Sequence, residues 1–128
     1  GDFAMGPKEN IPHYRAALHG RIVLVLGNHD RSAAFMRGAG FVDGVHQDLH
    51  VEIDGVRCYL RHRPPWGKDG RPFGDPESWR RTPGRPGPEV FLCGHVHQNW
   101  RSKGDVHNVG VDIHGFRPVS LRQVLDGG

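Results

Sequence analysis

The sequence predicts a single α/β domain that is rich in loops. Its 128 residues are enough for one compact domain with its own core. Hydrophobic residues make up 36 % and charged residues 24 %, while 19 glycines and 10 prolines indicate many turns in a globular chain. A stretch with helical spacing leads, after one glycine, into a continuous aliphatic run, and this helix-to-strand step is typical of layered α/β folds.

The first part of the chain predicts two short helices and one strand. Residues 11–19 carry Pro12 in the first turn, apolar residues at helical spacing and Gly20 as a stop, so we expect a helix there. The run "RIVLVL" at 21–26 indicates a strand covered on both faces. Residues 32–37, ended by "GAG", predict the second helix.

The rest of the chain predicts a hairpin, a long loop and three more strands. Residues 49–62 alternate around an Asp54-Gly55 turn, which is the pattern of a hairpin. Residues 64–88 are rich in Pro, Gly and Arg and predict a surface loop within the domain, with one helical turn carrying Trp79. Aromatic residues in this loop are expected to anchor it to the core. Further strands are expected at 89–94, 106–113 and 117–121.

Composition indicates the cellular environment of the protein but says little about its binding partners. The net charge is +3, with an Arg-rich stretch at 71–85, which would attract phosphate or nucleic acid but is too small to decide between partners. Cys58 and Cys93 lie in apolar runs and predict buried free thiols in a reducing compartment, the cytoplasm. No apolar run reaches the length of a membrane span, and no signal peptide is evident, so we expect no membrane partner. The sequence contains no feature that indicates an oligomeric state.

Potential metal ligands follow three of the predicted strands. The first strand ends in the run "LVLGNHD" at residues 24–30. The candidate metal-binding or proton-transferring side chains after the three strands are Asn28, His29, Asp30, His62, His95 and His97. In open α/β sheets ligands collect at the carboxyl ends of strands, so we expect these groups to converge. The glycines before Asn28 and His95 would free the backbone to turn toward the site. If the strand stays extended there, His95 and His97 share one face and reach two adjacent metal ions.

Four short motifs together resemble the calcineurin-like metallophosphoesterase family. They are Gly1-Asp2, Gly27-Asn28-His29-Asp30, the lone His62 and Gly94-His95-Val96-His97, in the order that the family has. The resemblance covers residues 1 to about 112 and implies a layered β-sandwich flanked by helices. The family's Asp-any-His motif should precede Gly1, so the first strand is expected to be missing and the domain partial. The triplets at 48–50, 105–107 and 112–114 stand in the wrong order to replace it.

The resemblance implies a role for each of these residues. Asp2 would bridge two metal ions, Asn28, His62 and His95 would complete one site, and His97 would belong to the other. His29 would stabilise charge on the phosphate or protonate the leaving oxygen, with Asp30 fixing its tautomer. Arg63 beside the lone His is a candidate phosphate ligand.

The predicted activity is hydrolysis of a phosphate ester, most readily a phosphodiester, by a metal-activated water. Nitrogen and oxygen ligands suit Mn²⁺, Fe or Zn²⁺, two ions in the full-length protein and one in this chain, which is therefore expected to be impaired. One alternative is a non-catalytic basic module that binds phosphate or nucleic acid and keeps a single structural metal. A cysteine hydrolase built on Cys93 is a third.

Overall fold

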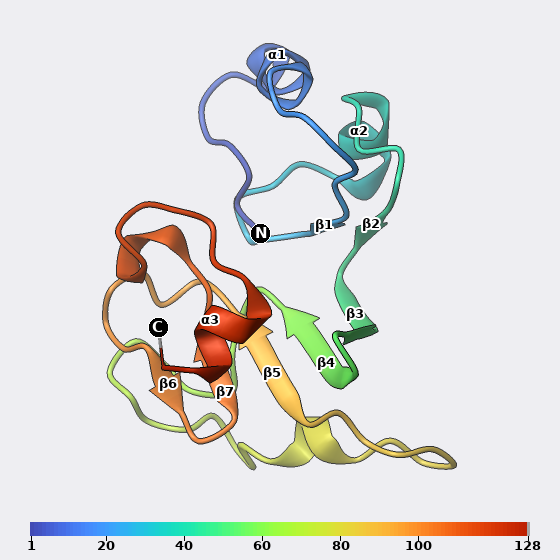
Figure 1. Cartoon of the computed structure of the whole chain (residues 1–128). Coiled ribbons are helices and arrows are strands. Elements are labelled where there is room, and N and C mark those ends of the chain that lie inside the picture. The colour runs from blue at the N-terminus through green and yellow to red at the C-terminus, as the bar shows by residue number, and fades with distance from the viewer. Residues whose placement is uncertain (128) are drawn as a thin grey trace.

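The computed structural model describes residues 1–127 and shows a mixed α/β fold with short helices (Figure 1). The helical elements are η1 (Lys8–Asn10), α1 (Ile11–Ala16), α2 (Ala33–Gly38), η2 (Ser78–Arg80), η3 (Val111–Ile113) and α3 (Leu121–Leu125). The strands are β1 (Leu24–Val25), β2 (Val45–His46), β3 (Asp48–Ile53), β4 (Val56–Arg61), β5 (Val90–Cys93), β6 (Ser102–Lys103) and β7 (Val106–Asn108).

The strands form two sheets within the described residues. β1 and β2 make a parallel two-stranded sheet, and the other five strands make a mixed sheet in the order β3-β4-β5-β7-β6. β5 is parallel to both of its neighbours, β4 and β7, whereas β3 and β6 are antiparallel edge strands. Figure 1 shows α1 and α2 gathered around the small sheet, β2 leading into β3, and α3 beside the large sheet.

Three apolar clusters hold this arrangement together. The first joins α1 and α2 to the small sheet through Ile11, Met36 and Phe41, each at most 2 % exposed. The second lies under the long loop, and the third packs Leu121 and Val124 of α3 against the large sheet. Removal of a buried ring such as Phe41 costs about 3–5 kcal/mol, so the first cluster alone fixes the small sheet firmly.

Most of the predicted elements are present. Ser32 caps α2 by accepting a hydrogen bond from the backbone N–H of Phe35 at 3.2 Å, as the Ser-led helix at 32–37 predicts. β3 and β4 form the expected hairpin, and Asp54 and Gly55 both have positive φ, as its two-residue turn requires. The range 64–88 is irregular apart from η2 and one isolated bridge, and η2 is the predicted turn at Trp79.

Three strand predictions fail in extent or in kind. The strand at 21–26 shortens to β1, and Val23 is 48 % exposed, so the run is not covered on both faces. The strand at 106–113 stops at Asn108 and continues as η3. The prediction at 117–121 is wrong, because Ser120 and Gln123 form a capping box that starts α3 and turns the apolar pair Leu121 and Val124 onto the sheet.

Candidate functional site

The register between β4 and β5 places two of the predicted ligands, His62 and His95, next to each other just beyond the ends of these strands. The strands are parallel with Leu60 opposite Leu92, so their carboxyl ends meet at the same edge. The backbone N–H of Gly94 donates to the carbonyl of His62 at 2.9 Å, which extends this pairing beyond the strands. His62 and His95 therefore lie side by side, with ring centroids 5.2 Å apart.

Asp2 and Asn28 complete a four-residue cluster, called the Asp2 cluster below, with His62 and His95. Nε2 of His62 lies 2.8 Å from Oδ1 of Asn28 and 3.1 Å from Oδ2 of Asp2. Nδ1 of His95 lies 3.2 Å from the same Asn28 oxygen. The four side chains come from four separate segments, so the convergence predicted at the strand ends is present.

Three atom pairs in the Asp2 cluster have separations that two ligands of one ion can have, and the same separations are those of direct hydrogen bonds. Donors held at about 2.1 Å from one ion and at right angles to each other lie about 3.0 Å apart, which matches the separations of 2.8–3.2 Å in the Asp2 cluster. Within residues 1–127, no group of three or more His, Cys, Asp or Glu side chains stands ready to hold a metal. This holds for Asp2, His62 and His95 as well, so the cluster is not a preformed metal cage, and its two imidazoles, one carboxylate and one amide would have to rearrange around an ion.

Two glycines allow the cluster to close. A Cβ on Gly27 would lie 2.1 Å from Oδ1 of Asp2, and one on Gly1 would lie 2.5 Å from Nδ1 of His62. Neither Gly27 nor Gly94 has positive φ, so the expectation that these glycines free the backbone to turn is wrong. Gly27 is needed because another segment passes too close for a side chain.

Backbone strain is concentrated at the predicted ligands instead. Asp2, His95 and His97 have φ of 54°, 68° and 50°, a left-handed conformation that is costly for residues other than glycine. The His95–His97 segment is therefore turned and not extended, so the two rings do not share a strand face as expected. Strained non-glycine residues of this kind gather at functional sites.

His97 lies outside the Asp2 cluster and has its own partner. Its Nδ1 is 3.2 Å from Oδ2 of Asp112, which belongs to η3, and both side chains are well exposed. Asn108, only 1 % exposed, donates to the carbonyls of His97 and Trp100 at 2.7 and 2.9 Å. Sequence analysis did not identify the His97–Asp112 pair, which forms because the segment after β7 lies beside the one after β5.

Asp30 ties the N-terminal segment to the loop after β1. Its Oδ2 accepts hydrogen bonds from the backbone N–H groups of Asp2 and Gly27, both at 2.8 Å, and its Oδ1 accepts one from Phe3 at 2.7 Å. In return, Oδ1 of Asp2 accepts a hydrogen bond from the backbone N–H of His29 at 2.8 Å. Asp30 thus orients a metal-ligand candidate, whereas its predicted action on the His29 ring stays a prediction.

The imidazoles differ in their surroundings. The ring of His29 is exposed and makes no hydrogen bond to the described residues. Burial lowers the pKa of His62 against the opposing charge of Asp2, and burial followed by the nearby Arg63 charge lowers that of His95. Both cluster rings are therefore neutral at pH 7, which is the form that binds a metal.

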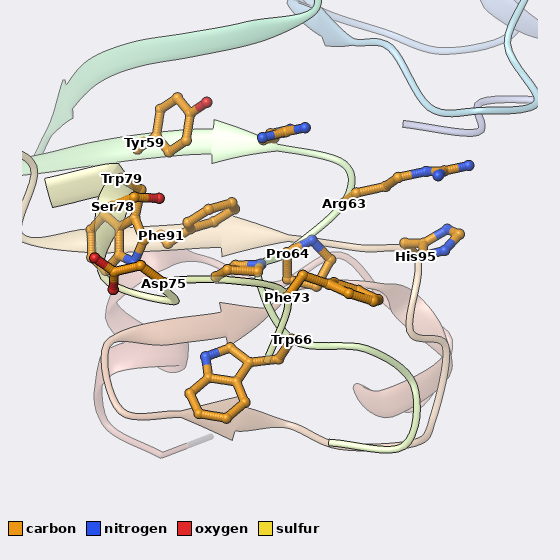
Figure 2. Close-up of a pocket in the computed structure, with 12 residues that line it drawn as sticks. Tyr59, Arg63, Pro64, Trp66, Phe73, Asp75, Ser78, Trp79, Phe91 and His95 are labelled. Atoms are coloured by element: carbon orange, nitrogen blue, oxygen red, sulfur yellow. The ribbon is translucent and has the colours of Figure 1, made fainter. Parts of the chain in front are cut away.

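The cationic side chains near the site fall into two groups. Arg63 is exposed and forms no ion pair with any described residue, and Figure 2 shows it extending toward the same side as His95. In the long loop, Arg80 pairs with Glu77 and with Asp105, and Arg81 pairs with Asp75 at 2.6 Å. Much of the positive charge of the 71–85 stretch is therefore balanced locally.

The cysteines are buried free thiols, as predicted. Burial raises the pKa of Cys93 far above its usual range, and its Sγ lies 3.5 Å from the carbonyl oxygen of His107. A thiol in this state supplies no thiolate at neutral pH, so the structure gives no support to a cysteine nucleophile.

One solved structure matches the fold. The chain is similar to the crystal structure of AQ665, a protein of unknown function from Aquifex aeolicus, with a TM-score of 0.59 and 25 % sequence identity over 94 % of this chain and 68 % of that chain. No protein-family model matches the chain, and a search of curated proteins found no match. Within residues 1–127 no helix combines the length and apolar character that a bilayer crossing requires. The likeness supports the mixed α/β fold and assigns no activity.

Proposed function

We propose that the protein is a metal-dependent phosphoesterase related to the calcineurin-like metallophosphoesterases, and that it hydrolyses a phosphodiester. The observation that carries this proposal is the Asp2 cluster, in which two imidazoles, a carboxylate and an amide from four segments lie at donor separations of 2.8–3.2 Å. In this proposal the small and large sheets belong to the layered sandwich of that family, and free buried thiols favour a cytoplasmic location.

One divalent ion per chain is the stoichiometry we propose, held by the Asp2 cluster. Two nitrogen and two oxygen donors suit Mn²⁺, Fe or Zn²⁺. Such an ion supplies an acidic bound water and neutralises charge on phosphate oxygens. His97 has Asp112 as its one carboxylate partner within residues 1–127, so a second ion, as in the dinuclear family, would need ligands from elsewhere.

His29 is the proposed proton donor. The backbone N–H of His29 donates to Oδ1 of Asp2, which anchors this residue beside the cluster, and its exposed ring makes no hydrogen bond to the described residues. During hydrolysis a bond forms between phosphorus and the oxygen of a water, which loses a proton to solvent, while the bond to the leaving oxygen breaks. His29 in its protonated form gives a proton to that oxygen, so the alcohol leaves neutral, and the ring takes up a proton from solvent afterwards. Arg63 then binds the remaining phosphate oxygens through its planar donors.

The alternative of a basic binding module has less support. It depends on the Arg-rich stretch at 71–85, and Arg80 and Arg81 there are engaged with carboxylates. It also gives no reason for strained backbone at Asp2, His95 and His97.

The metal proposal is tested by elemental analysis after incubation with Mn²⁺. We expect one ion per chain in the wild type, at least tenfold weaker binding in Asn28→Ala, and no change in Asn99→Ala. The side chain of the control residue Asn99 makes one hydrogen bond, to the carbonyl of Val96, and none to a residue of the Asp2 cluster. Absence of bound metal in the wild type overturns the proposal.

The proton-donor role is tested with diphenyl phosphate as substrate in the presence of Mn²⁺, because its phenoxide leaving group is basic enough to need a proton. We expect His29→Ala to lower turnover by about 10²–10⁴-fold with metal content intact. His19→Ala, which removes an exposed imidazole far from the cluster in the chain, should leave turnover unchanged. Equal turnover in His29→Ala and wild type rules out this role.

A further inference from the structure

A cavity of about 510 Å³ opens beside His95 on the side of the long loop. Its volume lies within the range of about 300–1,000 Å³ that small-molecule sites occupy. Figure 2 shows aromatic side chains along its length, Arg63 and His95 toward one end, and Asp75 and Ser78 toward the other. The cavity therefore begins at the Asp2 cluster and leads away from it.

The inner wall is rigid and aromatic. Tyr59 and Trp79 meet the ring of Phe91 edge to face, at centroid distances of 5.0 and 5.6 Å, and Trp79 is covered on another side by the guanidinium of Arg80 at 4.2 Å. The Tyr59 hydroxyl donates to Asp48 at 2.8 Å. These contacts fix flat apolar surfaces before any ligand enters.

The outer wall is an aromatic ring that the core does not cover. Phe73 is 69 % exposed, unlike the loop tryptophans, so the expectation that it anchors the loop is not met. Its backbone N–H donates to the carbonyl of Pro65 at 2.7 Å, and Trp66 pairs with Pro72 in an isolated bridge. The buried Trp100 holds this turn by donating from Nε1 to the carbonyl of Gly67 at 2.9 Å. Phe73 is thus presented to the cavity on an anchored backbone.

The two ends of the cavity carry opposite polar groups. Arg63 lines it near His95, where a guanidinium group suits a phosphate. At the other end the Asp75 carboxylate accepts from the backbone of Glu77 and from Arg81, and 46 % of its side chain remains exposed. A carboxylate with free acceptor sites suits an amino or hydroxyl donor.

We propose that this cavity binds the nucleoside part of a nucleoside phosphate, with the base between Phe73 and the inner aromatic wall and the phosphate beside Arg63 and His95. The inference rests on the proposed phosphoesterase function and assigns its substrate class. Aromatic faces bind any nucleobase by stacking, and the carboxylate at the far end offers an acceptor to an exocyclic amino group of the base. The order of chemistry along the cavity, cation then aromatic then acceptor, is the order along a nucleotide.

The test is equilibrium binding of adenosine 5′-monophosphate, ribose 5-phosphate and inorganic phosphate to the 128-residue chain, by calorimetry. We expect adenosine monophosphate to bind at least tenfold more tightly than ribose 5-phosphate. Phe73→Ala should lower the affinity for adenosine monophosphate about tenfold and leave the affinity for ribose 5-phosphate unchanged. The matched control is Phe116→Ala, since Phe116 is 76 % exposed and does not line the cavity; it should alter neither affinity.

Equal binding of the two phosphates, or an unchanged affinity in Phe73→Ala, overturns the inference. A single-stranded RNA that binds far more tightly than the mononucleotide, with steep salt dependence, overturns it in favour of a nucleic-acid surface. The two proposals fail separately, because binding needs no turnover. Phe73-dependent binding without Mn²⁺-dependent hydrolysis removes the enzyme and keeps the cavity as a nucleotide site, whereas hydrolysis without base preference keeps the enzyme and removes the nucleoside assignment.

Discussion

Asp30→Ala tests the idea that a single carboxylate assembles the candidate site. The substitution removes the acceptor for three backbone N–H groups, those of Asp2, Phe3 and Gly27. Hydrogen bonds to a charged acceptor contribute about 1.5–3 kcal/mol each, so three independent bonds would sum to about 5–9 kcal/mol. The amides of Asp2 and Phe3 regain water once the segment loosens, and we therefore expect a loss of about 3 kcal/mol in the free energy of unfolding.

Urea unfolding followed by tryptophan fluorescence measures this loss. Asp30→Asn should fall between the wild type and Asp30→Ala: its amide oxygen can keep the two bonds made by Oδ2, while its NH₂ group opposes the N–H of Phe3. Asp43→Ala is the control, because the partner of Asp43, Arg21, is 88 % exposed, and the change should stay within about 0.5 kcal/mol. Wild-type stability and wild-type Mn²⁺ affinity in Asp30→Ala would refute the reasoning.

Three further predictions follow from the geometry of the site. Gly27→Ala should abolish Mn²⁺ binding in elemental analysis, because the new Cβ would overlap the Asp2 carboxylate, whereas Gly38→Ala meets nothing within 4 Å and should bind normally. Asn108→Ala should lower the free energy of unfolding in urea by about 2–4 kcal/mol, since it leaves two carbonyls unpaired at a buried position; a loss below 0.5 kcal/mol would contradict this. Burial lowers the pKa of His107, so the unfolded chain binds more protons, and the stability present above about pH 6.5 should decline as pH falls and level off below the folded-state pKa. His107→Asn should reduce this slope in urea titrations between pH 7.5 and 5, and an unchanged slope would exclude His107 as its source.

The elements and the cluster were predictable where local chemistry and tertiary packing agree. The hairpin follows from alternation around Asp54-Gly55, and α2 follows from its Ser cap. Convergence of His62 and His95 follows from polar groups placed at strand ends, because the parallel strands β4 and β5 carry those ends to one edge, whereas Asn28 follows β1 of the other sheet and its place beside them is set by tertiary packing.

Features set by contacts distant in sequence were not predictable from pattern. A strand-like run at 117–121 became the start of α3 because a capping box and a sheet contact outweigh β-propensity. The role of Asp30 depends on the backbone N–H groups of Asp2 and Phe3, which lie 28 and 27 positions earlier in the sequence. In the sequence Phe73 does not differ from other loop aromatics, and only the folded structure shows that it lines a cavity.

The parallel pairing of β4 with β5 also makes the Asp2 cluster a reporter of complete folding. Asn28 lies 34 positions from His62 and 67 positions from His95 in the sequence, so no short segment of the chain contains the whole site. Closing loops of that length is entropically costly, and the cluster depends on both sheets, because Asn28 follows a strand of the small sheet and His62 and His95 follow strands of the large one. One cut in the 64–88 loop would separate His62 from His95 in sequence while removing little regular secondary structure. Loss of metal affinity would then reveal such a nick before any loss of helix or strand content does.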